Sequence, residues 1–144
     1  MDIRVFSTEP VIEIDGVKYR HHPNGGGLVA ETARVDETAY IGPFAKVCGR
    51  ASITENAYVF GSAWIFDNAR ISGAAEVFGN ARVFGNARVY GDAKVFGFAR
   101  VYGDARVHGH AEVSEFAEVN GSDDIGGKEK VTGAKSKERE KVPA

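Results

Sequence analysis

Residues 75–110 read AEVFGN-ARVFGN-ARVYGD-AKVFGF-ARVYGD-ARVHGH, six variants of one six-residue unit. The unit continues in both directions without an insertion and gives sixteen consecutive hexads from Gly27 to Ser122. The first slot is Ala in every hexad except at Gly27, and the third slot is always Val or Ile. The fifth slot is most often Gly, and the sixth is often Asn, Asp or Ser. A fixed short period of this kind is typical of a stacked repeat architecture.

Each hexad predicts a short strand followed by a corner. The A-x-V-x half alternates as a strand does, so slots one and three point inward and slots two and four point outward. Gly followed by Asn or Asp tolerates the positive φ of a sharp corner. Ala in the first slot leaves a narrow interior, which favours a triangular coil with three hexads in each 18-residue rung. The sequence therefore predicts an all-β protein, a parallel β-helix of about five rungs over residues 27–122.

The segment before the repeats, residues 1–26, predicts an N-terminal cap. Val11–Ile14 and Val17–Arg20 flank Asp15-Gly16, and Asp-Gly between apolar runs favours a two-residue β-hairpin. A hairpin here would cover the strand edge that a solenoid exposes at its end. The pair His21-His22 that follows is expected to lie in a solvated loop.

Residues 123–144 predict a flexible polar tail. The segment reads DDIGGKEKVTGAKSKEREKVPA, is mixed in charge and is nearly devoid of large apolar residues. We expect it to leave the last rung open or covered by another chain.

Composition and net charge limit the classes of partner and the compartment that we expect for this protein. With 18 basic and 20 acidic residues the net charge is −2, which gives no global attraction to nucleic acid or to an anionic membrane. The single cysteine, Cys48, excludes an intrachain disulfide and fits a reducing compartment. The start MDIRVFSTEP lacks a signal-peptide pattern, and no apolar run approaches the ~18 residues of a membrane span. We expect a cytoplasmic protein with no membrane partner.

The repeats over residues 27–122 resemble the hexapeptide-repeat family. The resemblance implies a left-handed coil, an exception to the right-handed crossover rule. The A-x-V-x-G-N/D form, preceded by a hairpin and Gly-Gly-Gly, is similar to uncharacterised proteins of bacteria and their phages, so a phage virion or the host cytoplasm is also implied. The well-studied relatives are acyltransferases and γ-type carbonic anhydrases, commonly trimers with active sites between subunits.

Stacking every third hexad places aromatic ladders on two faces. The predicted interface residues are Trp64, Phe66, Phe84 and Tyr102 on the first face and Phe60, Phe78 and Phe96 on the third. Exposed apolar arrays of this size indicate a contact surface, and two such faces suit a homotrimer. The alternatives are in-register stacking that only stabilises neighbouring rungs, and a carbohydrate ligand.

The second face carries a column of Arg70, Arg88 and Arg106 in the second slot. Like charges at the strand spacing of ~5 Å repel unless something compensates them. Asp92 and Asp104 at the corners are candidates for this. Otherwise the column is an anion-binding site for a phosphate or a polyanion. The alternative is that the arginines pack over their neighbours.

Catalytic candidates are few. His108 and His110 are the only histidines in the repeats, and Asp92 lies one rung below His110. The resemblance to the acyltransferases, which use a histidine in this way, makes the Asp–His pair a candidate for an oriented general base at a subunit boundary. The competing interpretation is that these residue types are those a corner tolerates. His-x-His alone is a weak zinc pattern, so no metal is predicted.

The sequence leaves two functions open. The first is a non-enzymatic oligomeric scaffold or binding protein, bacterial or phage-like, with no cofactor. It is favoured because no loop interrupts the hexads to build a water-excluding pocket. The alternative is an acyltransferase with a site at a subunit boundary, using acetyl-CoA or another acyl-CoA.

Overall fold

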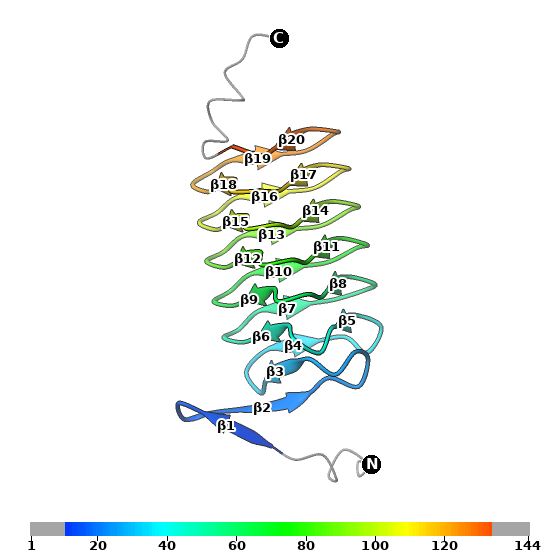
Figure 1. The fold of residues 1–144 in the computed structure, drawn as a ribbon, viewed down its shortest axis with the longest axis vertical. Coiled ribbons are helices and arrows are strands. Elements are labelled where there is room, and N and C mark those ends of the chain that lie inside the picture. Colours follow the sequence, from blue (N-terminus) through cyan, green and yellow to red (C-terminus); the bar gives the residue numbers. More distant parts are fainter. Residues whose placement is uncertain (1–10, 134–144) are drawn as a thin grey trace.

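The computed structural model describes residues 11–133, and all regular structure in this range is β-strand (Figure 1). Most strands contain two residues, because each hexad contributes slots two and three to a ladder before the corner turns the chain. The bounds are β1 Ile12–Ile14, β2 Val17–His21, β3 Leu28–Ala30, β4 Arg34–Val35, β5 Tyr40–Ile41, β6 Lys46–Val47, β7 Ser52–Ile53, β8 Tyr58–Val59, β9 Trp64–Ile65, β10 Arg70–Ile71, β11 Glu76–Val77, β12 Arg82–Val83, β13 Arg88–Val89, β14 Lys94–Val95, β15 Arg100–Val101, β16 Arg106–Val107, β17 Glu112–Val113, β18 Glu118–Val119, β19 Asp124–Ile125 and β20 Lys130–Val131.

Every third strand belongs to the same sheet. The first sheet has the order β1-β2-β3-β6-β9-β12-β15-β18, the second β4-β7-β10-β13-β16-β19 and the third β5-β8-β11-β14-β17-β20. Strands β3 to β20 pair in parallel with a shift of eighteen residues, as Arg70 does with Arg88. The chain is therefore a parallel β-solenoid of about six turns, which confirms the predicted all-β fold (Figure 1). The left-handed sense of the coil stays a prediction.

The interior is a narrow column of small side chains. From Ala39 onward, the Ala of the first slot and the Val or Ile of the third slot are at most 2% exposed up to Val119. Burying one Val side chain contributes about 1.5–3 kcal/mol, so each rung adds a similar increment. No helix in the described part of the chain is long and apolar enough to cross a bilayer.

The corners require the glycines because the rungs stack backbone on backbone. Gly85 has a φ of +67°, and a Cβ at this position would lie 2.8 Å from the backbone nitrogen of Gly103 on the next rung. At two corners the fifth slot carries an acid that bonds to the rung above, and at one of them Glu55 Oε1 accepts the Gly73 N–H at 2.6 Å. Asp67, with a φ of 58°, accepts the Gly85 N–H through Oδ2 at 3.1 Å.

The N-terminal hairpin is confirmed. Strands β1 and β2 pair antiparallel across Asp15 and Gly16, which have φ values of 51° and 80°. Strand β2 then pairs antiparallel with β3 and covers the N-terminal edge of the first sheet. The expected solvated loop at His21-His22 is wrong for His22, which is 7% exposed and has Nε2 2.9 Å from the Ala39 oxygen. The carbonyl of Ala39 faces the turn and gives this imidazole a buried partner.

The solenoid continues beyond Ser122. Strands β19 and β20 add to the second and third sheets, and Val131 is buried in register with Val113. The prediction of a polar tail from residue 123 is therefore wrong for residues 123–133, and residues 134–144 lie outside the described range. The repeat persists because Ile125 and Val131 keep the third slot apolar, although the first slot changes from Ala to an acid.

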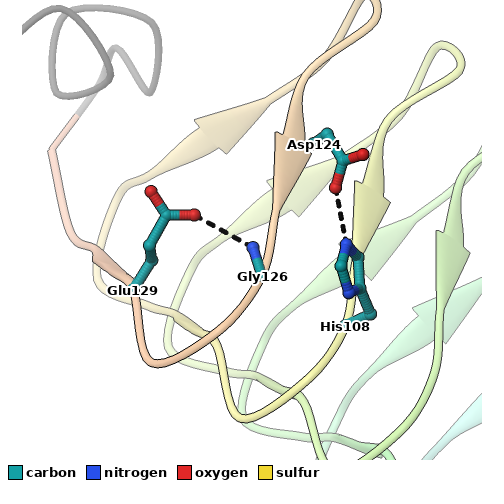
Figure 2. A network of polar contacts seen from close by, with 4 residues as sticks. All are labelled: His108, Asp124, Gly126 and Glu129. Atoms are coloured by element: carbon teal, nitrogen blue, oxygen red, sulfur yellow. Dashed lines mark hydrogen bonds and ion pairs between the residues drawn. The ribbon is translucent and has the colours of Figure 1, made fainter.

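These acids close the last described turn. In lower rungs the slot-four N–H donates to a backbone oxygen one rung above, as Tyr102 does to Val119 at 2.9 Å. The slot-four N–H of Asn120 donates instead to Asp123 Oδ2 at 3.1 Å. Figure 2 shows the equivalent bond from Gly126 N–H to Glu129 Oε1, which measures 2.9 Å. In both bonds the acceptor is a carboxylate from the next hexad.

Candidate functional site

The three outward arginines lie in register on the second sheet. Arg70, Arg88 and Arg106 occupy β10, β13 and β16, and each is the pairing partner of the next. All three side chains are exposed. The 18-residue rung predicted from the sequence therefore places this column correctly.

A surface groove of about 450 Å³ follows the arginine column. It is lined by Asn68, Arg70, Asn86, Arg88, Asp104 and Arg106. The groove forms because the buried first-slot Ala separates the sixth-slot side chains from those of the second slot, and Ala87 and Ala105 are 0% exposed. Three guanidinium groups and one carboxylate give it a net charge of +2.

No carboxylate among residues 11–133 forms an ion pair with Arg70, Arg88 or Arg106. The corner acids Asp92 and Asp104 were the candidates for compensating the column, and neither forms an ion pair with these arginines within this range. Neighbouring guanidinium groups at the strand spacing repel each other by roughly 1 kcal/mol in water. An anion in the groove would relieve this repulsion.

The column ends at Asp124, which binds a histidine rather than an arginine. Asp124 is the pairing partner of Arg106, but its Oδ1 lies 2.6 Å from Nε2 of His108 (Figure 2). The His108 ring stacks on Tyr90 with centroids 5.0 Å apart and an interplanar angle of 11°. This stacking directs the edge of the imidazole to Asp124, and Arg106 has no ion pair with a carboxylate of residues 11–133.

The aromatic ladders stack as continuous columns. On the first sheet, Phe66–Phe84 and Phe84–Tyr102 have ring centroids 4.8 Å apart and interplanar angles of 3° and 4°. On the third sheet the equivalent distances for Phe60–Phe78 and Phe78–Phe96 are 4.8 and 4.9 Å. These rings are half-buried, with their faces turned to their ladder neighbours. In-register stacking is therefore confirmed, and their role in an interface stays a prediction.

Trp64, the remaining predicted interface residue, lies between two cations on the neighbouring rungs. Lys46 Nζ is 5.0 Å from its ring centroid, and the Arg82 guanidinium carbon is 5.4 Å away. Its Nε1–H points to Cys48 Sγ at 3.4 Å. The indole thus joins a local polar–aromatic cluster on the first sheet.

The predicted catalytic residues do not form one constellation. His110 Nδ1 lies 3.9 Å from Asp92 Oδ2, longer than a hydrogen bond, and both side chains are exposed. His108 is engaged separately with Asp124. Within residues 11–133 no group of three or more His, Cys, Asp or Glu side chains is placed to hold a metal ion. A general-base role for these histidines stays a prediction.

The most exposed aromatic side chains were missed by the sequence reasoning. Phe44, Phe98 and Phe116 are 82%, 54% and 70% exposed, and all occupy the sixth slot of one corner column. Phe98 and Phe116 stack with centroids 5.2 Å apart. Their spacing of eighteen residues was the available signal. A groove of about 510 Å³ runs beside them, lined by Asn80, Arg82, Phe98, Arg100, Phe116 and Glu118.

Comparison with known proteins agrees with the fold. A family model described as the YdcK Beta solenoid repeat matches residues 75–91 and 81–97, which are the most regular hexads. No curated protein and no solved structure matches the chain. The match supports a β-helix repeat in general rather than the hexapeptide acyltransferases in particular. The chain is a β-solenoid repeat protein.

Proposed function

We propose that this protein is a non-enzymatic binding scaffold that holds an extended polyanion along Arg70, Arg88 and Arg106. The observation that carries the proposal is the in-register exposure of three guanidinium groups in one groove, without an ion pair to any carboxylate of the described residues. Asp124, the nearest carboxylate in the column, is already bound to His108.

The chemistry of the groove suits a linear chain of anionic groups. An arginine presents a fixed fork of N–H donors and keeps its charge at any working pH, which matches phosphate, sulfate and carboxylate oxygens. The amides of Asn68 and Asn86 line the same groove and can donate to the chain. Because backbone bonds fix the rung spacing, the backbone that carries these donors needs little ordering on binding.

The test measures binding of a long polyphosphate chain by titration calorimetry over a series of salt concentrations. Three phosphate contacts predict a slope of log K against log salt of about −2, at roughly 0.7 per contact. Arg88→Gln should weaken binding and make the slope shallower by roughly 0.7–1. The matched control is Lys94→Gln, which removes one charge from the same slot of the third sheet. There the strand register places Lys94 between Glu76 and Glu112.

Two results would refute the proposal. One is the absence of polyphosphate binding by the wild-type protein at low salt. The other is an equal loss of affinity in Arg88→Gln and Lys94→Gln, which would mean that net charge alone governs the interaction.

A carbohydrate ligand and a trimer built through the two ladders are the alternatives to this proposal. A sugar stacks on the face of an aromatic ring, whereas the inner rings of both ladders turn their faces to each other. The groove on the second sheet offers charge and hydrogen-bond donors instead, and we therefore favour the polyanion.

The acyltransferase alternative is separated by a different ligand. Its predicted site near His108 and His110 would bind acetyl-CoA, and His110→Ala would weaken that binding. An acetyl-CoA titration without detectable binding would remove this alternative and leave the polyanion proposal untouched.

A further inference from the structure

The corner that carries Phe98 and Phe116 differs from the other corners. The sixth slot one rung below is Asn80, and most sixth slots hold small polar residues. Two stacked phenyl rings that are 54% and 70% exposed leave a continuous apolar strip along two rungs. An apolar strip of this kind beside a groove is typical of a contact surface.

Beside the strip, the first sheet presents opposite charges on successive rungs. Arg100 on β15 is the pairing partner of Glu118 on β18, and both line the groove with the two phenylalanines. No ion pair joins them or reaches Arg100 from elsewhere in the described residues. Glu118 Oε1 lies 3.4 Å from the Tyr102 hydroxyl, which holds this carboxylate at the groove.

We propose that a second copy of this chain docks antiparallel on this strip, through a two-fold axis that lies across the solenoid between the two rungs. Such an axis reverses the order of the rungs. It therefore places Phe98 against the partner's Phe116 and Arg100 against the partner's Glu118, and each contact occurs twice. A two-fold interface needs one self-complementary patch, and in this patch each phenyl ring meets a phenyl ring and each of these two charges meets its opposite.

The order of the charges along the strip favours a second copy of this chain that runs antiparallel to the first. A parallel neighbour at the same level would place Arg100 near its own symmetry copy, where like charges repel. An antiparallel neighbour pairs each cation with an anion. The dimer surface belongs to the first sheet and its corner, whereas the polyanion groove belongs to the second sheet, so the dimer does not depend on the proposed function.

The first experiment measures the dimer dissociation constant of the full chain by sedimentation equilibrium. The double variant Phe98→Asn/Phe116→Asn introduces Asn at both positions. Asn80 shows that this corner column accepts Asn. The double variant should raise the dissociation constant at least about tenfold. Phe44→Asn is the control, because Phe44 is 82% exposed in the same column three rungs away and should leave dimerisation unchanged. A wild-type protein that stays monomeric at about 100 µM, or equal weakening by Phe44→Asn, would overturn the proposal.

The second experiment tests the antiparallel register. Arg100→Glu alone and Glu118→Arg alone should each dimerise at least about tenfold more weakly, because both contacts become repulsive. An equimolar mixture of the two variants should recover the dimer, since every contact across the mixed pair is then between opposite charges. A fold defect in either variant would not be repaired by mixing. Failure of the mixture to associate more tightly than each variant alone would reject this register.

Discussion

The acid at position 123 gives a sharp test of what stabilises the solenoid beyond Ser122. Ala occupies the first slot of all but one of the hexads up to Ser122, so Asp123→Ala would extend the consensus by one unit. If the repeat pattern alone governed stability, this substitution would stabilise the protein. The structure predicts the opposite sign, because Asp123 Oδ2 accepts the Asn120 N–H at 3.1 Å where lower rungs use a backbone oxygen.

The expected loss follows from that bond. A hydrogen bond to a charged acceptor contributes about 1.5–3 kcal/mol, and a side chain that caps an open backbone N–H contributes about 0.5–2 kcal/mol. Asp123 is 5% exposed while Asn120 is half-buried, so we expect Asp123→Ala to cost about 1–2 kcal/mol. The amide of Asn120 should then exchange with deuterium about 5–30-fold faster, and this can be followed by residue-resolved hydrogen exchange.

Two further variants control this experiment. Asp123→Asn keeps an oxygen acceptor without the charge and should retain part of the protection. Ala105→Asp places the same acid one rung lower, where the Tyr102 N–H already donates to Val119, and should destabilise the protein strongly. Unchanged exchange at Asn120 in Asp123→Ala, or a rise in unfolding free energy, would refute the capping role.

Two more predictions concern the corners and the hairpin. Gly85→Ala should lower the unfolding free energy in urea by about 1–3 kcal/mol more than Gly16→Ala, because both positions have positive φ but only Gly85 would bring a Cβ to 2.8 Å from backbone; equal losses would contradict the close approach. Burial, with a further contribution from Cys48, raises the pKa of the Tyr19 phenol. The folded state therefore holds this proton more tightly than the unfolded state, so stability is full below pH about 10 and falls as the pH rises to the raised pKa. Unfolding measured against pH in wild type and Tyr19→Phe should show this loss only in the wild type, and a loss of the same size in Tyr19→Phe would exclude Tyr19 as its source.

The sequence was sufficient to predict the outward columns. Once an 18-residue rung is assumed, Arg70, Arg88 and Arg106 must lie one above another, and the strand pairing places them so. The hairpin at Asp15-Gly16 was predictable for a similar reason, since its turn chemistry is local. Both predictions depend on backbone geometry that is nearly independent of what surrounds it.

The acids in the first slot at positions 123 and 129 were not predictable by the same rule. An acid in the first slot is expected to break the pattern, because every first-slot Ala from Ala39 to Ala117 is buried in the core. Asp123 and Glu129 instead each place a carboxylate against the slot-four N–H of the preceding hexad, a contact that slot identity does not predict. Periodicity predicts which positions face the interior, whereas the bond that a first-slot carboxylate forms depends on the local backbone donors around it.

The same distinction explains why the sequence placed the arginine column but not its partners. Arg106 and Asp124 are neighbours in register, and a pairing rule would join them. The competing partner is His108, whose ring is oriented by Tyr90 on the rung below, so a contact between aromatic rings decides where a carboxylate goes. The position of a residue in its hexad determines which side chains are its neighbours. The packing of the fourth-slot side chains against the second-slot side chains then determines which neighbours form a hydrogen bond or an ion pair. The positive charge of the groove, on which the proposed polyanion binding rests, is therefore a property of two adjacent columns rather than of the arginines alone.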